Sequence, residues 1–193
     1  GHNHPYAATA SNELDIKMAT MSLSAYNFYR GTDHIFFRDM LARPASAYTT
    51  LRSPRYRADT LIAWLRELKP DSVDLIIGIT GQDISITKYD ALGAIKEPVG
   101  KYRDFGIFGL GYIGGPSCVV STFRLGDGRS AVFFDRLMKV TVHEIGHNRR
   151  LPHCPDPSCV MRDAVERMSS IDAAGRMLCA RCSASLQGGN GPL

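Results

Sequence analysis

Length, composition and charge place this chain among ordinary globular proteins. It has 193 residues, of which 44% are hydrophobic, and its 23 basic and 19 acidic residues give a net charge of +4. That charge is too small to favour nucleic acid or an anionic membrane as a partner. Disordered and fibrous proteins are excluded, because only 22% of residues are charged and the 18 glycines and 10 prolines show no period. We expect a single domain over 1–193 without internal repeats, with two small domains as the alternative.

We expect neither a membrane span nor a secretory signal. The first 15 residues are polar and lack an apolar stretch. Residues 105–123 are uncharged, but five glycines and Pro116 interrupt them. This segment therefore predicts two strands joined by a Gly-Gly-Pro turn within a soluble sheet.

The first part of the chain predicts β-rich structure, a basic loop and a helix. Residues 14–37 are rich in β-branched and aromatic residues and favour strand or mixed structure. Residues 42–58 contain two prolines and four arginines, which indicates a solvated connecting loop. A nucleic-acid patch is the less favoured alternative, because no series of aromatic side chains accompanies the charge. A helix is expected over 59–69, with Asp59 as its cap and Pro70 as its stop.

The middle of the chain predicts a sheet followed by a long helix. Four apolar segments have strand length, namely 73–80, 84–88, 106–113 and 117–125. A turn at 126–129 follows, and Ser130 is placed to cap a second helix that runs to about Arg149. Prolines at 152, 155 and 157 then exclude regular structure until about Asp163. The two ends, 1–13 and 187–193, are expected to be mobile.

Glycines 109, 111 and 114 form the pattern GxGxxG, which also occurs in dinucleotide-binding folds. In those folds the third glycine opens a helix whose N-terminus holds the pyrophosphate. Here Pro116 and a second β-rich segment follow instead. We therefore interpret these glycines as part of a hairpin and expect no nucleotide site.

The strongest chemical signal is the segment His143-Glu144-Ile145-Gly146-His147. Residues four apart lie on one face of a helix, so both imidazoles can bind the same cation. Glu144 lies about 100° further round the helix and can reach a water molecule on that metal. Zn²⁺ lowers the pKa of a bound water toward about 7, and the carboxylate can then accept its proton as the water attacks a carbonyl. The alternative is a pair of surface histidines on an amphipathic helix.

His153 is the candidate third ligand and lies six residues beyond His147. A continuous helix cannot bring this spacing to one face, so the chain has to turn between the two residues. Pro152 favours the turn, because it disfavours helical geometry at Leu151. Three imidazoles and a water would form an open tetrahedral zinc site, which is the kind that catalyses reactions.

Four of the five cysteines fall in the last 40 residues as two close pairs, Cys154 with Cys159 and Cys179 with Cys182. Four thiolates at this spacing predict a closed, structural zinc site that clamps the ends of a long loop. The alternative is a redox-active Cys-x-x-Cys at 179–182, but no thioredoxin-like segment precedes it and the other pair would remain unexplained. Cys118 is interpreted as a buried core residue.

The sequence resembles the archaemetzincins, a branch of the metzincin zinc metallopeptidases. The resemblance lies in the segment HEIGHNRRLPHC and in the downstream residues Cys159, Val160-Met161 and Cys179-Ala-Arg-Cys182. The resemblance covers residues 143–182, where seven residues of metal-binding type have the spacing of the family. VVSTFRL at 119–125 resembles the sheet segment before the active-site helix of the family. Nothing before about residue 70 contributes to the resemblance.

The resemblance implies an α+β, zincin-like (metzincin) fold. A twisted mixed β-sheet with helices (14–150) would end in the active-site helix, and a short zinc-clamped C-terminal part (151–186) would follow. Two Zn²⁺ ions per chain are implied, one catalytic and one structural. The catalytic ligands would be His143, His147 and His153, the general base would be Glu144, and the structural ligands would be Cys154, Cys159, Cys179 and Cys182.

Two further positions follow from the resemblance. Met161 matches the methionine that lies beneath the catalytic metal in metzincins. Arg150 departs from the family, which has Gly or occasionally Asn in a left-handed turn three residues after the second histidine. A non-glycine residue in that conformation costs about 1–2 kcal/mol, unless the turn is built differently.

These observations predict a zinc metallopeptidase that acts on peptide or protein substrates and binds them by strand addition along the sheet edge at 109–113. One alternative is a zinc-binding scaffold with little hydrolytic activity, in which Arg149 and Arg150 guard the cleft. A weaker alternative is a zinc-ribbon protein that binds nucleic acid. Thiolate zinc ligands favour a reducing cytosol. We expect a monomer without nucleic-acid or membrane partners.

Overall fold

The computed structural model describes residues 42–128, 130–163 and 167–188. In chain order its elements are η1 (Ala45–Ala47), β1 (Tyr48–Thr49), β2 (Arg55–Arg57), α2 (Ala58–Leu68), β3 (Ile76–Thr80), β4 (Ile84–Ile86), α3 (Val99–Tyr102), β5 (Phe105–Ile107), β6 (Gly109–Gly111), β7 (Ser117–Ser121), α4 (Ala131–Asn148), α5 (Met168–Ala173) and α6 (Ala180–Gly188). The strand predicted within 14–37 and most of the mobile ends lie outside the described residues. No described helix is long and apolar enough to cross a membrane.

The strands form a mixed sheet in two hydrogen-bonded parts, which confirms the α+β prediction. One part has the order β1-β2-β4-β5 and the other β3-β7-β6. β2–β4 and β3–β7 are parallel pairs, whereas the other three pairs are antiparallel. Because β5 and β6 follow each other along one segment, that segment connects the two parts. The predicted hairpin is also confirmed, since β6 pairs antiparallel with β7.

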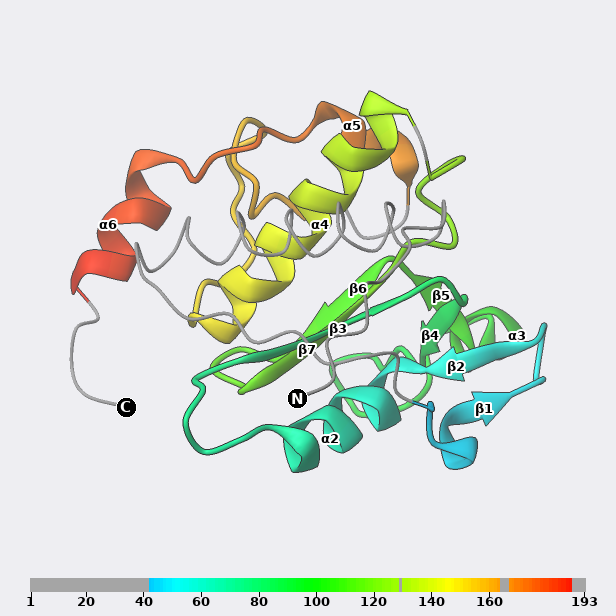
Figure 1. The fold of residues 1–193 in the computed structure, drawn as a ribbon. Coiled ribbons are helices and arrows are strands. Elements are labelled where there is room, and N and C mark those ends of the chain that lie inside the picture. The colour runs from blue at the N-terminus through cyan, green and yellow to red at the C-terminus, as the bar shows by residue number, and fades with distance from the viewer. Residues whose placement is uncertain (1–41, 129, 164–166, 189–193) are drawn as a thin grey trace.

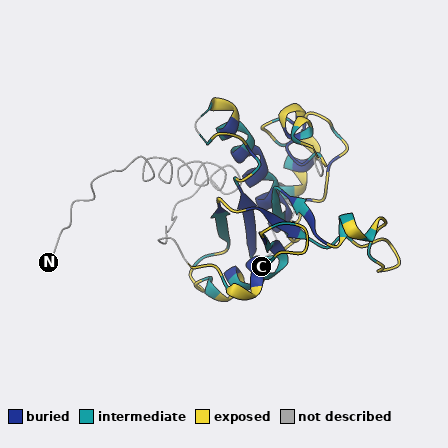
Figure 2. Cartoon of the chain, turned by 90° about the vertical axis from the view of Figure 1, so that its right-hand side faces the viewer, coloured by how far each residue is buried: buried dark blue, intermediate teal, exposed yellow. Residues whose placement is uncertain are grey.

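Two helices cover opposite sides of the strands (Figure 1), with α2 below the sheet and α4 above it. Both helices contact β7, whose five residues are all buried. One hydrophobic cluster lies between α2 and the strands, and a second joins α4 to the cysteine-rich C-terminal segment. Figure 2 shows the buried residues concentrated at the centre of the molecule and the exposed ones on its outer turns.

α2 forms close to its predicted position but is not capped by Asp59. The helix begins at Ala58, its N-cap is Arg57, and no side chain caps it. The Asp59 carboxylate instead pairs with the Arg57 guanidinium at 3.1 Å. The helix ends at Leu68, two residues before Pro70. Its buried residues are Ala58, Leu61, Ile62 and Leu65. The spacing predicts a stripe at 61, 64, 65 and 68, but Trp64 and Leu68 are only partly buried.

The prediction that 42–58 is only a solvated basic loop is wrong. This segment contains η1 and the antiparallel pair β1–β2, with Tyr48 opposite Tyr56 and their rings 5.4 Å apart. Arg55 is buried because two acidic side chains compensate its charge: its guanidinium lies 3.3 Å from Asp83 and 3.7 Å from Asp104. These carboxylates come from distant parts of the chain, so the local sequence did not reveal them.

α4 is the long helix predicted from Ser130 onward. The Ser130 hydroxyl accepts a hydrogen bond from the Phe133 backbone N–H, which satisfies one of the free donors at the helix start. The other end of α4 holds the β6–β7 hairpin: the Asn148 side-chain amide donates to the carbonyls of Tyr112 and Ser117, each at 3.1 Å. The hairpin is thereby fixed against the segment of α4 that carries the HExxH motif.

Candidate active site and cysteine cluster

The structure brings the two histidines of the HExxH motif together on one face of α4. Their Nε2 atoms are 3.0 Å apart and their ring centroids 4.6 Å apart. This is the geometry that a four-residue spacing on a helix produces. Both side chains line a cavity of about 270 Å³.

His153 reaches the same point through a tight turn at the end of α4. Arg150 adopts a φ of 68°, its N–H donates to the His147 carbonyl at 2.9 Å, and the Leu151 N–H donates to the Gly146 carbonyl at 2.9 Å. This pair of bonds is the Schellman pattern, in which a left-handed residue reverses the chain. The left-handed turn expected from the family is therefore present, with arginine at the position usually taken by glycine.

The three imidazoles converge. The His153 ring centroid lies 5.2 Å from that of His143 and 4.8 Å from that of His147. One nitrogen from each ring can be chosen so that all three lie within 4.8 Å of one another. A single cation can therefore contact all three rings.

Two of the rings are fixed by backbone carbonyls. Nδ1 of His143 lies 2.9 Å from the Val160 carbonyl, and Nδ1 of His147 lies 2.8 Å from the Leu151 carbonyl. A carbonyl can only accept, so each Nδ1 carries the proton and each Nε2 is left with a free lone pair. Burial lowers the pKa of both histidines, and it lowers the pKa of His143 to about 4. Both rings are neutral at pH 7, the form that binds a metal.

Glu144 lies between α4 and β6 and lines the same cavity. A Cβ added to Gly109 would come within 2.7 Å of its Cγ and Oε1, so only glycine leaves room for this side chain. Burial raises the pKa of Glu144 to about 8, and a hydrogen bond from the Gly111 backbone opposes that rise. The carboxyl group therefore lies against β6, and Glu144 lines the same cavity as the three imidazoles.

Of the remaining cavity wall, only the edge at 109–113 was predicted. Apolar side chains from β4, β5 and α5 also line the cavity, and Lys139 contributes to it from α4. The Lys139 ammonium is buried, with Asp135 at 2.9 Å and the carbonyls of Ile171 and Asp172 at 3.2 Å, so it ties α5 to α4. Lys139 lies four residues before His143 on the same helical face, a signal from which the sequence could have identified it.

Met161 is fully buried in the cluster that also contains Ile145 and Leu151. Its carbonyl accepts a hydrogen bond from the Cys154 N–H at 2.8 Å. This contact connects the segment after His153 to the segment that fixes the His143 ring.

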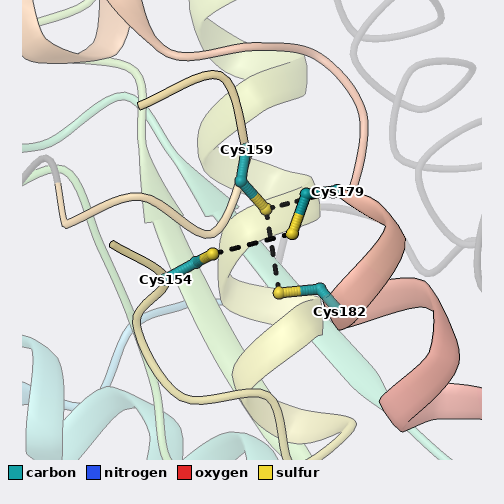
Figure 3. A group of neighbouring side chains, drawn as sticks. All are labelled: Cys154, Cys159, Cys179 and Cys182. Carbon is teal, nitrogen blue, oxygen red and sulfur yellow. Dashed lines mark hydrogen bonds between the residues drawn. The ribbon is translucent and has the colours of Figure 1, made fainter. Parts of the chain in front are cut away.

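The four C-terminal cysteines form a compact cluster (Figure 3), with their sulfur atoms within 4.8 Å of one another. Sγ of Cys154 lies 3.7 Å from that of Cys179, and Sγ of Cys159 lies 3.8 Å from that of Cys182. No disulfide joins them. Cys118 is fully buried, as predicted; it belongs to the same hydrophobic cluster but is not one of the four converging thiols. Four converging thiols are a ligand set that suits tetrahedral Zn²⁺.

The surroundings of this cluster favour a thiolate at Cys154, whereas burial raises the pKa of Cys159 and Cys182. The Arg181 guanidinium donates to Sγ of Cys154 at 3.2 Å, and the Cys179 N–H donates to Sγ of Cys159 at 3.3 Å. Burial disfavours ionisation of Cys154, but the Asp156 N–H, Arg181 and the neighbouring thiols together lower the pKa of this thiol to about 7. Arg181 was not singled out in the sequence.

The GxGxxG glycines belong to the hairpin, as expected. Gly109 and Gly111 lie in β6, and Gly114 adopts a φ of 72° in the turn that follows. A Cβ on Gly111 would lie 2.6 Å from the Glu144 carbonyl oxygen, so the backbone of β6 packs directly on α4. The glycines therefore provide close packing and leave no phosphate-binding helix.

Comparisons with known proteins agree with this geometry. The model of peptidase family M54 matches residues 38–188. An archaemetzincin of Haloarcula marismortui is 34% identical over 148 residues, which cover 72% of this chain and 75% of that protein. An archaemetzincin of Methanopyrus kandleri is 30% identical over 144 residues, which cover 75% of this chain and 72% of that protein.

The fold is also similar to a solved structure. The crystal structure of the archaemetzincin from Methanopyrus kandleri superposes with a TM-score of 0.72 at 25% identity, covering 94% of this chain and 89% of that chain. Sequence and fold therefore point to the same group of proteins.

Proposed function

This chain belongs to the archaemetzincins, peptidase family M54, and is a zinc metallopeptidase; from that premise we propose that it hydrolyses peptide bonds in the cleft between α4 and β6. The observation that supports this most strongly is the convergence of three imidazoles beside a buried carboxyl group in one cavity. Peptides or proteins are the substrates. The sequence predicted this function from the same residues.

We assign the catalytic zinc to His143, His147 and His153. The donor set fits the ion, because two of the rings are neutral and their Nδ1 atoms are already engaged by carbonyls. Three protein ligands leave a fourth position for water or substrate. When bound, a zinc ion supplies Lewis acidity that polarises the scissile carbonyl and makes a coordinated water more acidic.

Glu144 is the general base and acid in this proposal. Burial favours the protonated form of this group, and a zinc ion at the adjacent imidazoles would favour the carboxylate. The carboxylate accepts the proton of the attacking water and returns it to the leaving amine. Its position against Gly109 supports this role, because a substrate bound along β6 would lie close to it. Gly109 is required there, since a larger residue would displace the carboxyl group.

β6 binds the extended substrate in this proposal. The strand forms one edge of the three-stranded part of the sheet, so an added strand can pair with its outward backbone groups other than the Gly111 N–H, which donates to Glu144. The cavity beside it is lined mainly by apolar side chains, which would hold an apolar side chain of the substrate next to the scissile bond.

Cys154, Cys159, Cys179 and Cys182 hold a second, structural zinc in this proposal, for which their converging sulfur atoms are the support. With four protein ligands that ion has no open position and takes no part in the chemistry. Its role is to fix the C-terminal segment against α4.

The test compares peptide-library cleavage by the wild type and by Glu144→Gln, both loaded with zinc to the same content. Loss of a general base typically lowers the rate by about 10²–10⁴-fold, and we expect a loss in this range. The matched control is Glu67→Gln on the exposed side of α2, which makes the same chemical change away from the cleft. Undiminished cleavage by Glu144→Gln would refute its role, and a zinc-loaded wild type that cleaves no peptide would refute the proposed function.

A further inference from the structure

His153 is held differently from the other two imidazoles. Its ring lies on the loop after α4, and 45% of its side chain is exposed. Among the described residues, the only partner of its Nδ1 is the carboxylate of Asp163, at 3.7 Å. The other two histidines have a backbone carbonyl in the same position, at 2.9 and 2.8 Å.

We propose that Asp163 is a positioning residue that orients His153 as the third zinc ligand and strengthens zinc binding at the imidazoles. This inference rests on the function proposed for the three histidines. A carboxylate beside Nδ1 favours the tautomer with its proton on Nδ1, which leaves the lone pair of Nε2 for the metal. Asp163 therefore acts on the exposed ring through its charge at 3.7 Å, whereas the carbonyls of Val160 and Leu151 hold the buried rings by hydrogen bonds.

The charge of Asp163 adds a second effect. Three neutral imidazoles leave the full +2 charge of a zinc ion uncompensated, and an anion close to the ligands stabilises that charge.

Asp163 lies on a segment that is anchored in the core, which suits a positioning role. It lies two residues after Met161, which is fully buried, and four after Cys159, a member of the cysteine cluster. The segment that carries the carboxylate is therefore anchored at its start, although 56% of the Asp163 side chain is exposed. Exposure also means that substitution removes little packing, so a loss of metal affinity would not reflect a damaged core.

The experiment measures zinc affinity at the imidazoles in Asp163→Ala, Asp163→Asn and Asp163→Glu by competition with a chromophoric chelator. Loss of a second-shell partner typically costs about 10–100-fold in metal affinity, and we expect this for Asp163→Ala. Asp163→Asn keeps an acceptor oxygen without the charge and should fall between alanine and wild type. Asp163→Glu restores the charge and should recover most of the affinity. Glu67→Gln serves as the charge-matched control on α2.

The cysteine cluster provides an internal control for folding. Loading with Co²⁺ separates the two sites, because only thiolate ligands give intense near-ultraviolet charge-transfer bands. In every variant the thiolate bands should remain at wild-type intensity while binding at the imidazoles weakens. Wild-type affinity in Asp163→Ala, or a loss that Asp163→Glu does not recover, would overturn the assignment. A wild type that binds no zinc or cobalt at its imidazoles would refute the proposed function and this role with it.

Discussion

The turn at Arg150 gives a quantitative test of the active-site geometry. Arg150 is the one non-glycine residue with a positive φ in the part of the chain that the structure describes, at 68°. A Cβ in this conformation costs about 1–2 kcal/mol, and glycine removes that cost. Glycine also gives the unfolded chain more freedom, which offsets about 0.4–1 kcal/mol of the gain. Arg150→Gly should therefore be more stable than Arg150→Ala by about 0.5–1 kcal/mol.

Alanine is the matched reference because both variants lack the arginine side chain, which lies against Gly114. The expected difference corresponds to about 1–4 °C in Tm for a chain of this size, measured by thermal unfolding in excess zinc. Arg150→Asn should lie between the two, because asparagine adopts the left-handed conformation more readily than alanine. If Arg150→Ala has a Tm equal to or above that of Arg150→Gly, the turn is not strained and the reasoning is refuted.

Two further substitutions test the cleft and the cysteine cluster. Gly109→Ala should lower peptide cleavage at least about 10-fold at unchanged zinc content, because its Cβ would collide with Glu144 at 2.7 Å. The control is Gly100→Ala, where an added Cβ meets nothing within 4 Å. Equal activity of the two variants would contradict the prediction. Cys179→Ser should weaken zinc binding at the imidazoles as well as at the thiolates, because Cys154 directly follows His153. Retention of the imidazole-bound zinc with wild-type affinity would show that the two sites are independent.

The parts of the site that follow from helical periodicity could be predicted from sequence. A four-residue spacing places His143 and His147 on one face whatever surrounds the helix, and Ser130 specifies where that helix begins. The position of His153 depended on a turn whose usual glycine is replaced by Arg150. Spacing alone therefore required a turn, and only the observed φ and hydrogen bonds establish its form.

The parts that depend on distant contacts could not be predicted. Arg55 looked like a solvated charge because its partners Asp83 and Asp104 lie 28 and 49 residues away in the sequence. Asp163 could not be predicted either, because it lies in an irregular segment with no periodicity that would relate it to His153. Residues 42–58 were misassigned because strands of two or three residues carry too short a pattern to be recognised.

The segment from 159 to 163 contacts both predicted metal centres. It begins with a cysteine of the thiol cluster, its Val160 carbonyl fixes the ring of His143, and its last residue faces His153. Within it, the Met161 carbonyl accepts the hydrogen bond of the Cys154 N–H. A displacement of this segment would therefore disturb two imidazoles and two thiols at once. The thiol cluster closes a loop that contains this segment and begins directly after His153. A structural zinc would therefore order the catalytic ligands as it binds, and the two ions would be linked through one stretch of five residues.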